Sequence, residues 1–148
     1  MSDAQVLLFR AGGLRLGVFL AELRMLLTET ELLPIPFAHQ AMAGLMMSPE
    51  HGPLPVFDLS GLVDNARPAG HRSGATVALF PTARGPVGLR LDALLGTIAR
   101  YEAIEPGAAG EIHALAPALR ATVTSVATHD GMRFFFFSPD AFLAGLAL

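Results

Sequence analysis

The sequence contains no cysteine, which excludes disulfide bonds and thiolate chemistry. A chain without cysteine suits a reducing compartment, so we expect a cytoplasmic protein. Charge is also scarce, because only 16% of the residues are charged while 52% are hydrophobic. The net charge is −3 and the arginines are scattered. Without a basic stripe, nucleic acid is not an expected partner.

Long apolar runs are absent as well. No run reaches the roughly 18 residues that a membrane-spanning helix needs, and the first residues lack the basic-then-apolar order of a secretory signal. We therefore expect no membrane insertion. The 148 residues are enough for one domain. The high apolar fraction predicts a large core, a protein-binding face, or both.

Motifs that carry chemistry are missing too. The sequence has no GxSxG nucleophile elbow, no GxxxxGK[ST] phosphate loop and no HExxH zinc motif. The histidines stand far apart, without HxH or HxxxH spacing, and are His39, His51, His71, His113 and His129. We expect no catalytic residue, no metal site and no cofactor.

What the sequence does contain is an internal repeat. Residues 6–31 match residues 77–102 when the numbering is shifted by 71 (77 − 6), and this shift places Gly17 on Gly88. Apolar residues also fall on apolar residues along the matched segments. Two copies are too few for a solenoid, so the repeat predicts two similar subdomains packed on one another.

A second match extends the repeat, because residues 52–58 resemble residues 131–138. The order of matching segments therefore divides the single domain, residues 1–148, into two halves. We expect a first β subdomain at 5–64 and a second at 75–145. The polar residues 65–74, which include proline and glycine, are the expected linker between them.

Turn signals predict hairpins in both halves. Gly12-Gly13 lies between two apolar runs, and Asp130-Gly131 lies between two others. Both pairs are hairpin signals, and Asp-Gly suits a type I′ turn, in which the two central residues have positive φ. Short strands, regular turns and few helices indicate a mainly β, barrel-like pair of subdomains. The residues expected in its core are Leu8, Phe9, Leu16, Leu79, Phe80 and Leu89.

Three short helices are predicted. Asp58 and Ser138 hold equivalent places before apolar segments, where a side-chain oxygen can accept from the free N–H groups of a first helical turn. The second of these helices lies at the C-terminal end. In the segment Leu20–Leu27, leucines at helical spacing predict another helix.

Two apolar segments are candidates for binding or for the core. Residues 41–47 hold three of the six methionines, which suit either a core strand or an adaptable binding surface. Phe134–Phe137 would expose two aromatic side chains if the strand were covered on one face only. We therefore expect both of its faces to be covered, by the barrel core and by the other subdomain or the C-terminal helix.

Taken in order, the apolar, glycine and proline positions resemble those of the CheW-like domain family. The matching segments are Val6-Leu-Leu-Phe9, Gly17-Val18, Gly44-Leu-Met46, Pro55-Val-Phe-Asp58-Leu59, Val77-Ala-Leu-Phe80, Val87-Gly-Leu-Arg-Leu-Asp92 and His129-Asp-Gly-Met-Arg-Phe-Phe135. The resemblance covers about residues 5–145. It implies two SH3-like five-stranded β-barrel subdomains with a small terminal helix. It also implies a non-catalytic adaptor that joins chemoreceptors to a CheA-type histidine kinase.

The sequence departs from the family pattern where partners are expected to bind. In place of the family's Asn-Leu-Arg-Gly it has Met47–Gly52, so Pro49 or Glu50 replaces the arginine. Met25 stands where the family has an acidic residue. We expect the kinase regulatory domain, the receptor's cytoplasmic tip, or both, to contact this largely apolar surface. The expected partner-binding residues are Leu23, Met25, Leu26, Leu45, Met46, Met47, Pro49, Glu50 and His51.

Two other functions stay open. A CheW-like scaffold or dimerising module that no longer contacts both kinase and receptor would also fit the lost charges, and self-association is compatible with the high apolar fraction. A ligand-binding or enzymatic barrel would need a pocket with converging polar groups, whereas most polar residues here are placed at turns.

Overall fold

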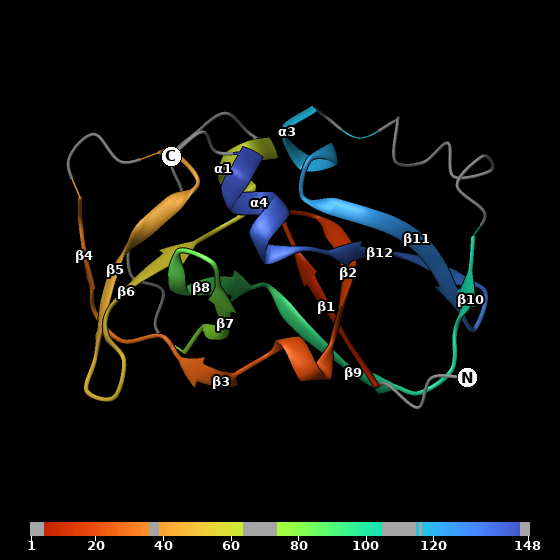
Figure 1. Cartoon of the computed structure of the whole chain (residues 1–148), viewed down its shortest axis with the longest axis horizontal. Helices are drawn as coiled ribbons and strands as arrows, with labels where there is room; N and C mark the ends of the chain where they lie inside the picture. Colours follow the sequence, from red (N-terminus) through yellow and green to blue (C-terminus); the bar gives the residue numbers. More distant parts are fainter. Residues whose placement is uncertain (1–4, 36–38, 64–73, 105–114, 116, 146–148) are drawn as a thin grey trace.

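The computed structural model describes residues 5–35, 39–63, 74–104, 115 and 117–145. In these residues the protein is mainly β, with two mixed sheets side by side (Figure 1). The helices α1, α3 and α4 lie towards the top of this view, and a single helical turn before β3 lies towards the bottom. Sheet A has the order β10-β11-β12-β2-β1-β9, and sheet B has the order β4-β5-β6-β8-β7-β3.

The bounds of sheet A's strands are β1 (Val6–Ala11), β2 (Leu14–Phe19), β9 (Ala93–Ile98), β10 (Glu102–Ala103), β11 (Val123–His129) and β12 (Met132–Phe137). Those of sheet B are β3 (Met25–Thr28), β4 (Leu32–Leu33), β5 (Met42–Ser48), β6 (Gly52–Phe57), β7 (Thr76–Thr82) and β8 (Gly85–Leu91). The helices are η1 (Leu20–Glu22, a 3₁₀ turn), α1 (Ser60–Val63), α3 (Pro117–Arg120) and α4 (Pro139–Gly145).

The repeat appears in the sheets strand for strand. The hairpin β1–β2 corresponds to β7–β8, and β11–β12 corresponds to β5–β6. Gly17 lies opposite Leu8 and pairs in parallel with Phe136, while Gly88 lies opposite Leu79 and pairs in parallel with Val56. The predicted equivalence of Gly17 and Gly88 is therefore confirmed.

The predicted division of the chain into halves is wrong at the level of the sheets. Sheet A combines β1 and β2 from the first half with β9 to β12 from the second. Sheet B combines β3 to β6 with β7 and β8. Residues 5–64 and 75–145 therefore exchange strands, because each chain segment that leaves a repeated hairpin crosses to the other sheet. Most of the predicted linker, residues 65–73, lies outside the described residues.

Two further predictions need correction. Each sheet has six described strands where five were expected, because the two-residue strands β4 and β10 add one to each. Leu20–Leu27 is a 3₁₀ turn followed by β3 and not a helix. Met25 and Leu27 pack on the core of sheet B, whereas Leu26 between them is 39% exposed. This alternation has the period of a strand.

The turns and caps agree with their predictions. Gly12 and Gly13 have φ of 61° and 79°, and Asp130 and Gly131 have φ of 51° and 77°. Both turns thus have the two positive φ values of a type I′ turn. An Asp58 carboxylate oxygen accepts a hydrogen bond from the Ser60 N–H (2.9 Å), and the Ser138 hydroxyl accepts one from the Ala141 N–H (3.1 Å).

Three apolar clusters hold the sheets together. Each sheet has its own cluster, and a larger central cluster contains residues of both sheets and of α4. All six predicted core residues are buried, with at most 3% exposure. Along β12, Phe134 and Phe136 enter the cluster of sheet A, while Phe135 and Phe137 contact the central cluster. Both faces of this strand are covered, as predicted.

Candidate functional site

The predicted partner-binding residues all lie on sheet B or on the segment that leads into it. Four of them are exposed, namely Leu26, Met47, Pro49 and Glu50. Four others are partly buried, namely Leu23, Met25, Leu45 and His51. Met46 is only 2% exposed and belongs to the core of sheet B. Its prediction as a binding residue is wrong, because successive side chains of β5 point to opposite faces and Met47 takes the outer one.

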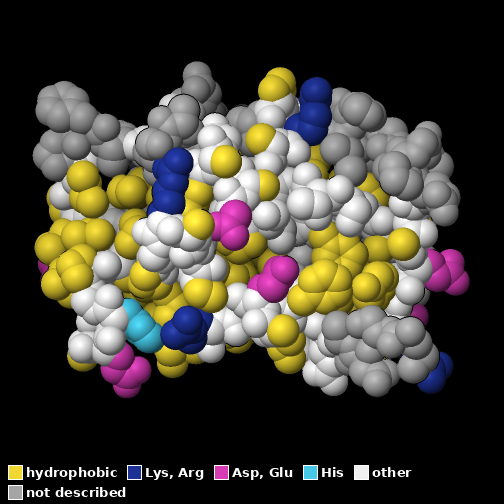
Figure 2. Space-filling model, viewed as in Figure 1, with side chains coloured by type: hydrophobic (Ala, Val, Ile, Leu, Met, Phe, Trp, Pro, Cys, Tyr) yellow, Lys and Arg dark blue, Asp and Glu magenta, His cyan; other side chains and the backbone are white. Residues whose placement is uncertain are grey.

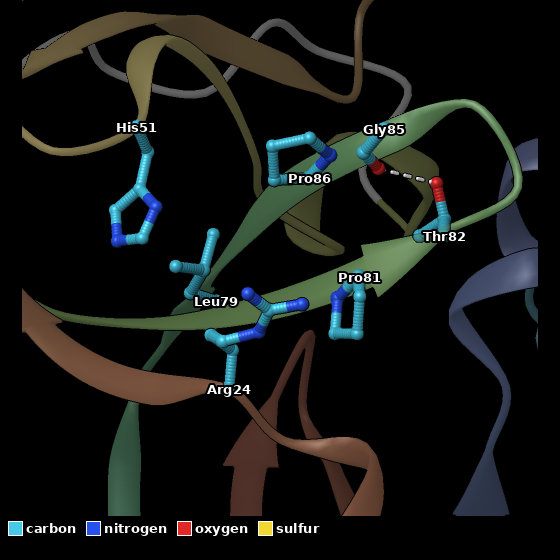
Figure 3. A pocket seen from close by; sticks show the side chains of 7 residues that line it. All are labelled: Arg24, His51, Leu79, Pro81, Thr82, Gly85 and Pro86. Atoms are coloured by element: carbon cyan, nitrogen blue, oxygen red, sulfur yellow. Dashed lines mark hydrogen bonds between the residues drawn. The ribbon is translucent and has the colours of Figure 1, made fainter.

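The curvature of sheet B brings two of these regions together. Arg24, just before β3, and His51, in the β5–β6 turn, line one pocket of about 270 Å³. The other lining residues come from β7 and β8 and are Leu79, Pro81, Thr82, Gly85 and Pro86. Figure 3 shows the Arg24 and His51 side chains on the same side of these two strands. Of these lining residues, His51 was among the predicted partner-binding residues, whereas Arg24 and the two prolines were not.

Polar groups around this pocket differ in how well they are satisfied. The Thr82 hydroxyl donates to the Gly85 carbonyl (2.6 Å) and accepts from the Arg84 N–H (3.1 Å). His51 Nε2 is buried and has no hydrogen-bond partner. The nearest acidic oxygen, Glu50 Oε2, lies 3.9 Å away, which is too far for a hydrogen bond.

A buried ion network lies within sheet B. Arg90 on β8 donates from Nε and Nη2 to the two oxygens of Glu29 (2.7 and 2.9 Å) and from Nη1 to Asp58 (3.1 Å). Exposure is at most 3% for all three residues. The network joins β8, the segment between β3 and β4, and the start of α1. Its burial makes it a structural element and not a binding surface.

Two pKa values shift for physical reasons that the structure shows. Burial alone would lower the pKa of Arg90, but the hydrogen bonds and charges of Glu29 and Asp58 outweigh it and raise that pKa. The pKa of Glu22 is raised, first by partial burial and second by the negative charge of Asp140. Asp140 also accepts a hydrogen bond from the Ala83 N–H (3.1 Å), which ties α4 to the β7–β8 turn.

The surface shows where apolar side chains gather. Figure 2 shows apolar groups over the sheet B end and over part of sheet A, with acidic side chains between them. The exposed large apolar residues are Leu20, Leu26, Leu33, Met47, Leu94, Leu95 and Met132. Among the described residues, no cluster of three or more histidine or acidic side chains could hold a metal ion. His71 and His113 lie outside these residues.

Mixed sheets with this repeated strand order define a two-subdomain β fold, and a solved structure has it too. The chain is similar to the scaffolding protein TtCheW from Thermoanaerobacter tengcongensis, with a TM-score of 0.72 and 14% sequence identity. The match covers 95% of this chain and 92% of that one. The fold is therefore CheW-like, as the sequence predicted. No protein-family model matches the chain, and no curated protein matches it.

The similar structure belongs to a scaffolding protein, and the present chain shares its architecture over nearly its whole length. In the part of the chain that the structure describes, no helix has the length and apolar character needed to cross a membrane.

Proposed function

We propose that this chain is a non-catalytic cytoplasmic adaptor in a bacterial chemosensory array, where it couples a chemoreceptor to a CheA-type histidine kinase. The observation that carries the proposal is the fold, which matches that of a CheW scaffolding protein over 95% of the chain. A scaffold needs a surface for partners and no reaction centre, and the exposed apolar side chains of sheet B supply such a surface.

The sheet B surface is the proposed contact region for at least one partner. Leu26 and Met47 are 39% and 52% exposed, although both are large apolar residues. Covering them would remove apolar area from water, which contributes roughly 25 cal/mol per Å². Pro49 and Glu50 at the tip of the β5–β6 hairpin extend the same region.

The test is binding of the kinase regulatory domain and of the receptor's cytoplasmic tip from the same organism, measured by isothermal titration calorimetry. We expect both to bind the wild-type protein, and Met47→Glu to weaken one of them about tenfold or more. Met132→Glu is the matched control, because Met132 is 50% exposed but lies on sheet A. An equal loss of affinity in Met47→Glu and Met132→Glu would mean that the contact does not lie on the sheet B surface. Binding of only one partner would favour the scaffold alternative over coupling.

A further inference from the structure

We infer that the pocket between Arg24 and His51 receives an acidic side chain carried by an apolar segment of a protein partner. The inference deepens the proposed adaptor function and rests on it for the identity of the partner. It assigns the pocket a carboxylate held by the Arg24 guanidinium, with the flanking apolar residues of the partner against the proline walls.

The walls of the pocket are suited to an apolar peptide segment. Pro81 on β7 and Pro86 on β8 lie opposite each other in the strand register, and both are exposed. Leu79 beneath them is 1% exposed and also belongs to the core of sheet B, so the inner end of the pocket is rigid. Proline and leucine offer no side-chain hydrogen bonds, so this part of the pocket can hold only apolar groups through its side chains.

The polar side of the pocket calls for a negative charge. Within the described residues the Arg24 guanidinium has no hydrogen-bond or ion-pair partner, and its side chain lies on the pocket. His51 Nε2 also lacks a hydrogen-bond partner but is closed to solvent, so a ligand oxygen does not reach it in this conformation. Because the Thr82 hydroxyl is already engaged, the Arg24 guanidinium is the side-chain group left to bind a ligand. A carboxylate can accept two parallel N–H bonds from one guanidinium.

The size of the pocket suits one or two side chains of a protein partner. At about 270 Å³ the pocket is smaller than the roughly 300–1,000 Å³ typical of small-molecule sites. One acidic side chain and part of a neighbouring aliphatic one would occupy it. The rest of the partner would then lie on the surface outside.

The corresponding place in sheet A has different chemistry. The repeat pairs Pro81 with Arg10 and Pro86 with Arg15, and these two arginines face each other across β1 and β2. Like charges in that arrangement oppose each other, and no proline wall is present there. An acidic–apolar segment that needs this wall would therefore distinguish the sheet B end from the sheet A end.

The direct test uses the peptides acetyl-Pro-Leu-Glu-Leu-amide and acetyl-Pro-Leu-Gln-Leu-amide as probes. Titrated into ¹⁵N-labelled protein, the Glu peptide should shift the amide signals of Arg24, Thr82 and Gly85 and bind about five- to tenfold more tightly than the Gln peptide. Arg24→Gln should abolish this difference, whereas Arg100→Gln, an exposed arginine between β9 and β10, should preserve it. Equal binding of the two peptides, or equal shifts with propionate at the same concentration, would overturn the inference.

A second arm separates this inference from the proposed function. Arg24→Glu, with Arg100→Glu as control, is titrated with the kinase regulatory domain and the receptor tip. Loss of one partner in Arg24→Glu alone supports both proposals. Binding of both partners unchanged in Arg24→Glu would sink the pocket inference and leave the adaptor function standing. Discrimination between the peptides without binding of either domain would keep the pocket and reject the adaptor function.

Discussion

At the scale of single residues, the two equivalent glycines show how closely the repeat is packed. A Cβ added to Gly88 would lie 2.6 Å from Val77 Cγ1, and one added to Gly17 would lie 2.9 Å from Val6 Cγ1 and from the Phe134 ring. Val6 and Val77 are themselves equivalent in the repeat. The same close approach of a hairpin partner therefore excludes a side chain in both sheets.

Alanine at these glycines should destabilise the protein. We expect Gly88→Ala and Gly17→Ala each to lower the free energy of unfolding by ~1–3 kcal/mol, the usual cost of overpacking a core. Urea titration measures this. Adding Val77→Ala to Gly88→Ala removes the clashing methyl group, so the double variant should lose less stability than the sum of the single losses. Strict additivity would contradict the proposed contact.

Arg90 has a structural role of its own, because it is the centre of the buried ion network. It holds two carboxylates that are as buried as itself, so removing the arginine alone leaves negative charges without compensation. Arg90→Met should cost ~3–5 kcal/mol of unfolding free energy, the range for breaking one side of a buried ion pair. Combining it with Glu29→Gln and Asp58→Asn should recover part of that loss, because the buried charges disappear and Asn still caps α1. A triple variant less stable than Arg90→Met would refute this account.

The ion network has no counterpart in the other sheet. In the repeat, Arg90 corresponds to Phe19 and Asp58 to Ser138. Phe19 stacks on Phe136 with ring centroids 5.0 Å apart, so sheet A uses aromatic contacts at a place where sheet B uses charges. The role of Arg90 could not be predicted from the sequence, because a lone arginine in an apolar strand gives no sign of partners that lie 61 and 32 positions away.

At the scale of elements, local signals predicted turns and caps correctly. Gly12-Gly13, Asp130-Gly131, Asp58 and Ser138 each act through atoms within a few residues, so their effect is visible in the sequence. The error at Leu20–Leu27 has a physical cause as well. The segment is rich in leucine, and its spacing satisfied a helical pattern although pairing with β7 makes Met25–Thr28 a strand.

The candidate site could be predicted only in part, because local sequence signals do not show how distant strands are arranged. The sequence pointed to β3 and the β5–β6 hairpin, but it could not show which side chains of these strands face out. It also could not show that Arg24 and His51 line one pocket over β7 and β8, because their placement depends on the curvature of the whole sheet.

The strand β5 offers a direct test of alternation. Met46 is 2% exposed and Met47 is 52% exposed. Met46→Glu should cost several kcal/mol or prevent folding, because it buries an unpaired carboxylate among apolar side chains. Met47→Glu should change the unfolding free energy by less than ~0.5 kcal/mol, as expected of surface substitutions. Thermal denaturation of both variants distinguishes this register from one shifted by a residue, which would reverse the two results.

At the scale of the whole molecule, the exchange of strands is what the sequence repeat could not reveal. Self-similarity identifies equivalent residues but does not say which copies pair. Both parallel pairs, β2 with β12 and β6 with β8, join strands from different halves of the chain. The central core also takes residues from both sheets.

This topology predicts how the chain behaves when it is cut. Fragments 1–68 and 69–148 should each fail to fold alone. The first keeps only β1 and β2 of sheet A, and its β3 lacks β7, while in the second β9 lacks β1 and β12 lacks β2. Mixed together, they should form a folded one-to-one complex, because each supplies the strands that the other lacks. The intact chain should unfold in one calorimetric transition, since the shared core couples both sheets.

The measurement is a ¹⁵N correlation spectrum of each labelled fragment, alone and with its unlabelled partner. Dispersed signals should appear only in the mixture and should match those of the intact protein. A dispersed spectrum from fragment 69–148 alone, with a cooperative melting transition, would mean that β7 to β12 can pair among themselves. The strands would then not need the exchange that defines the sheets, and independent halves would be the stable units.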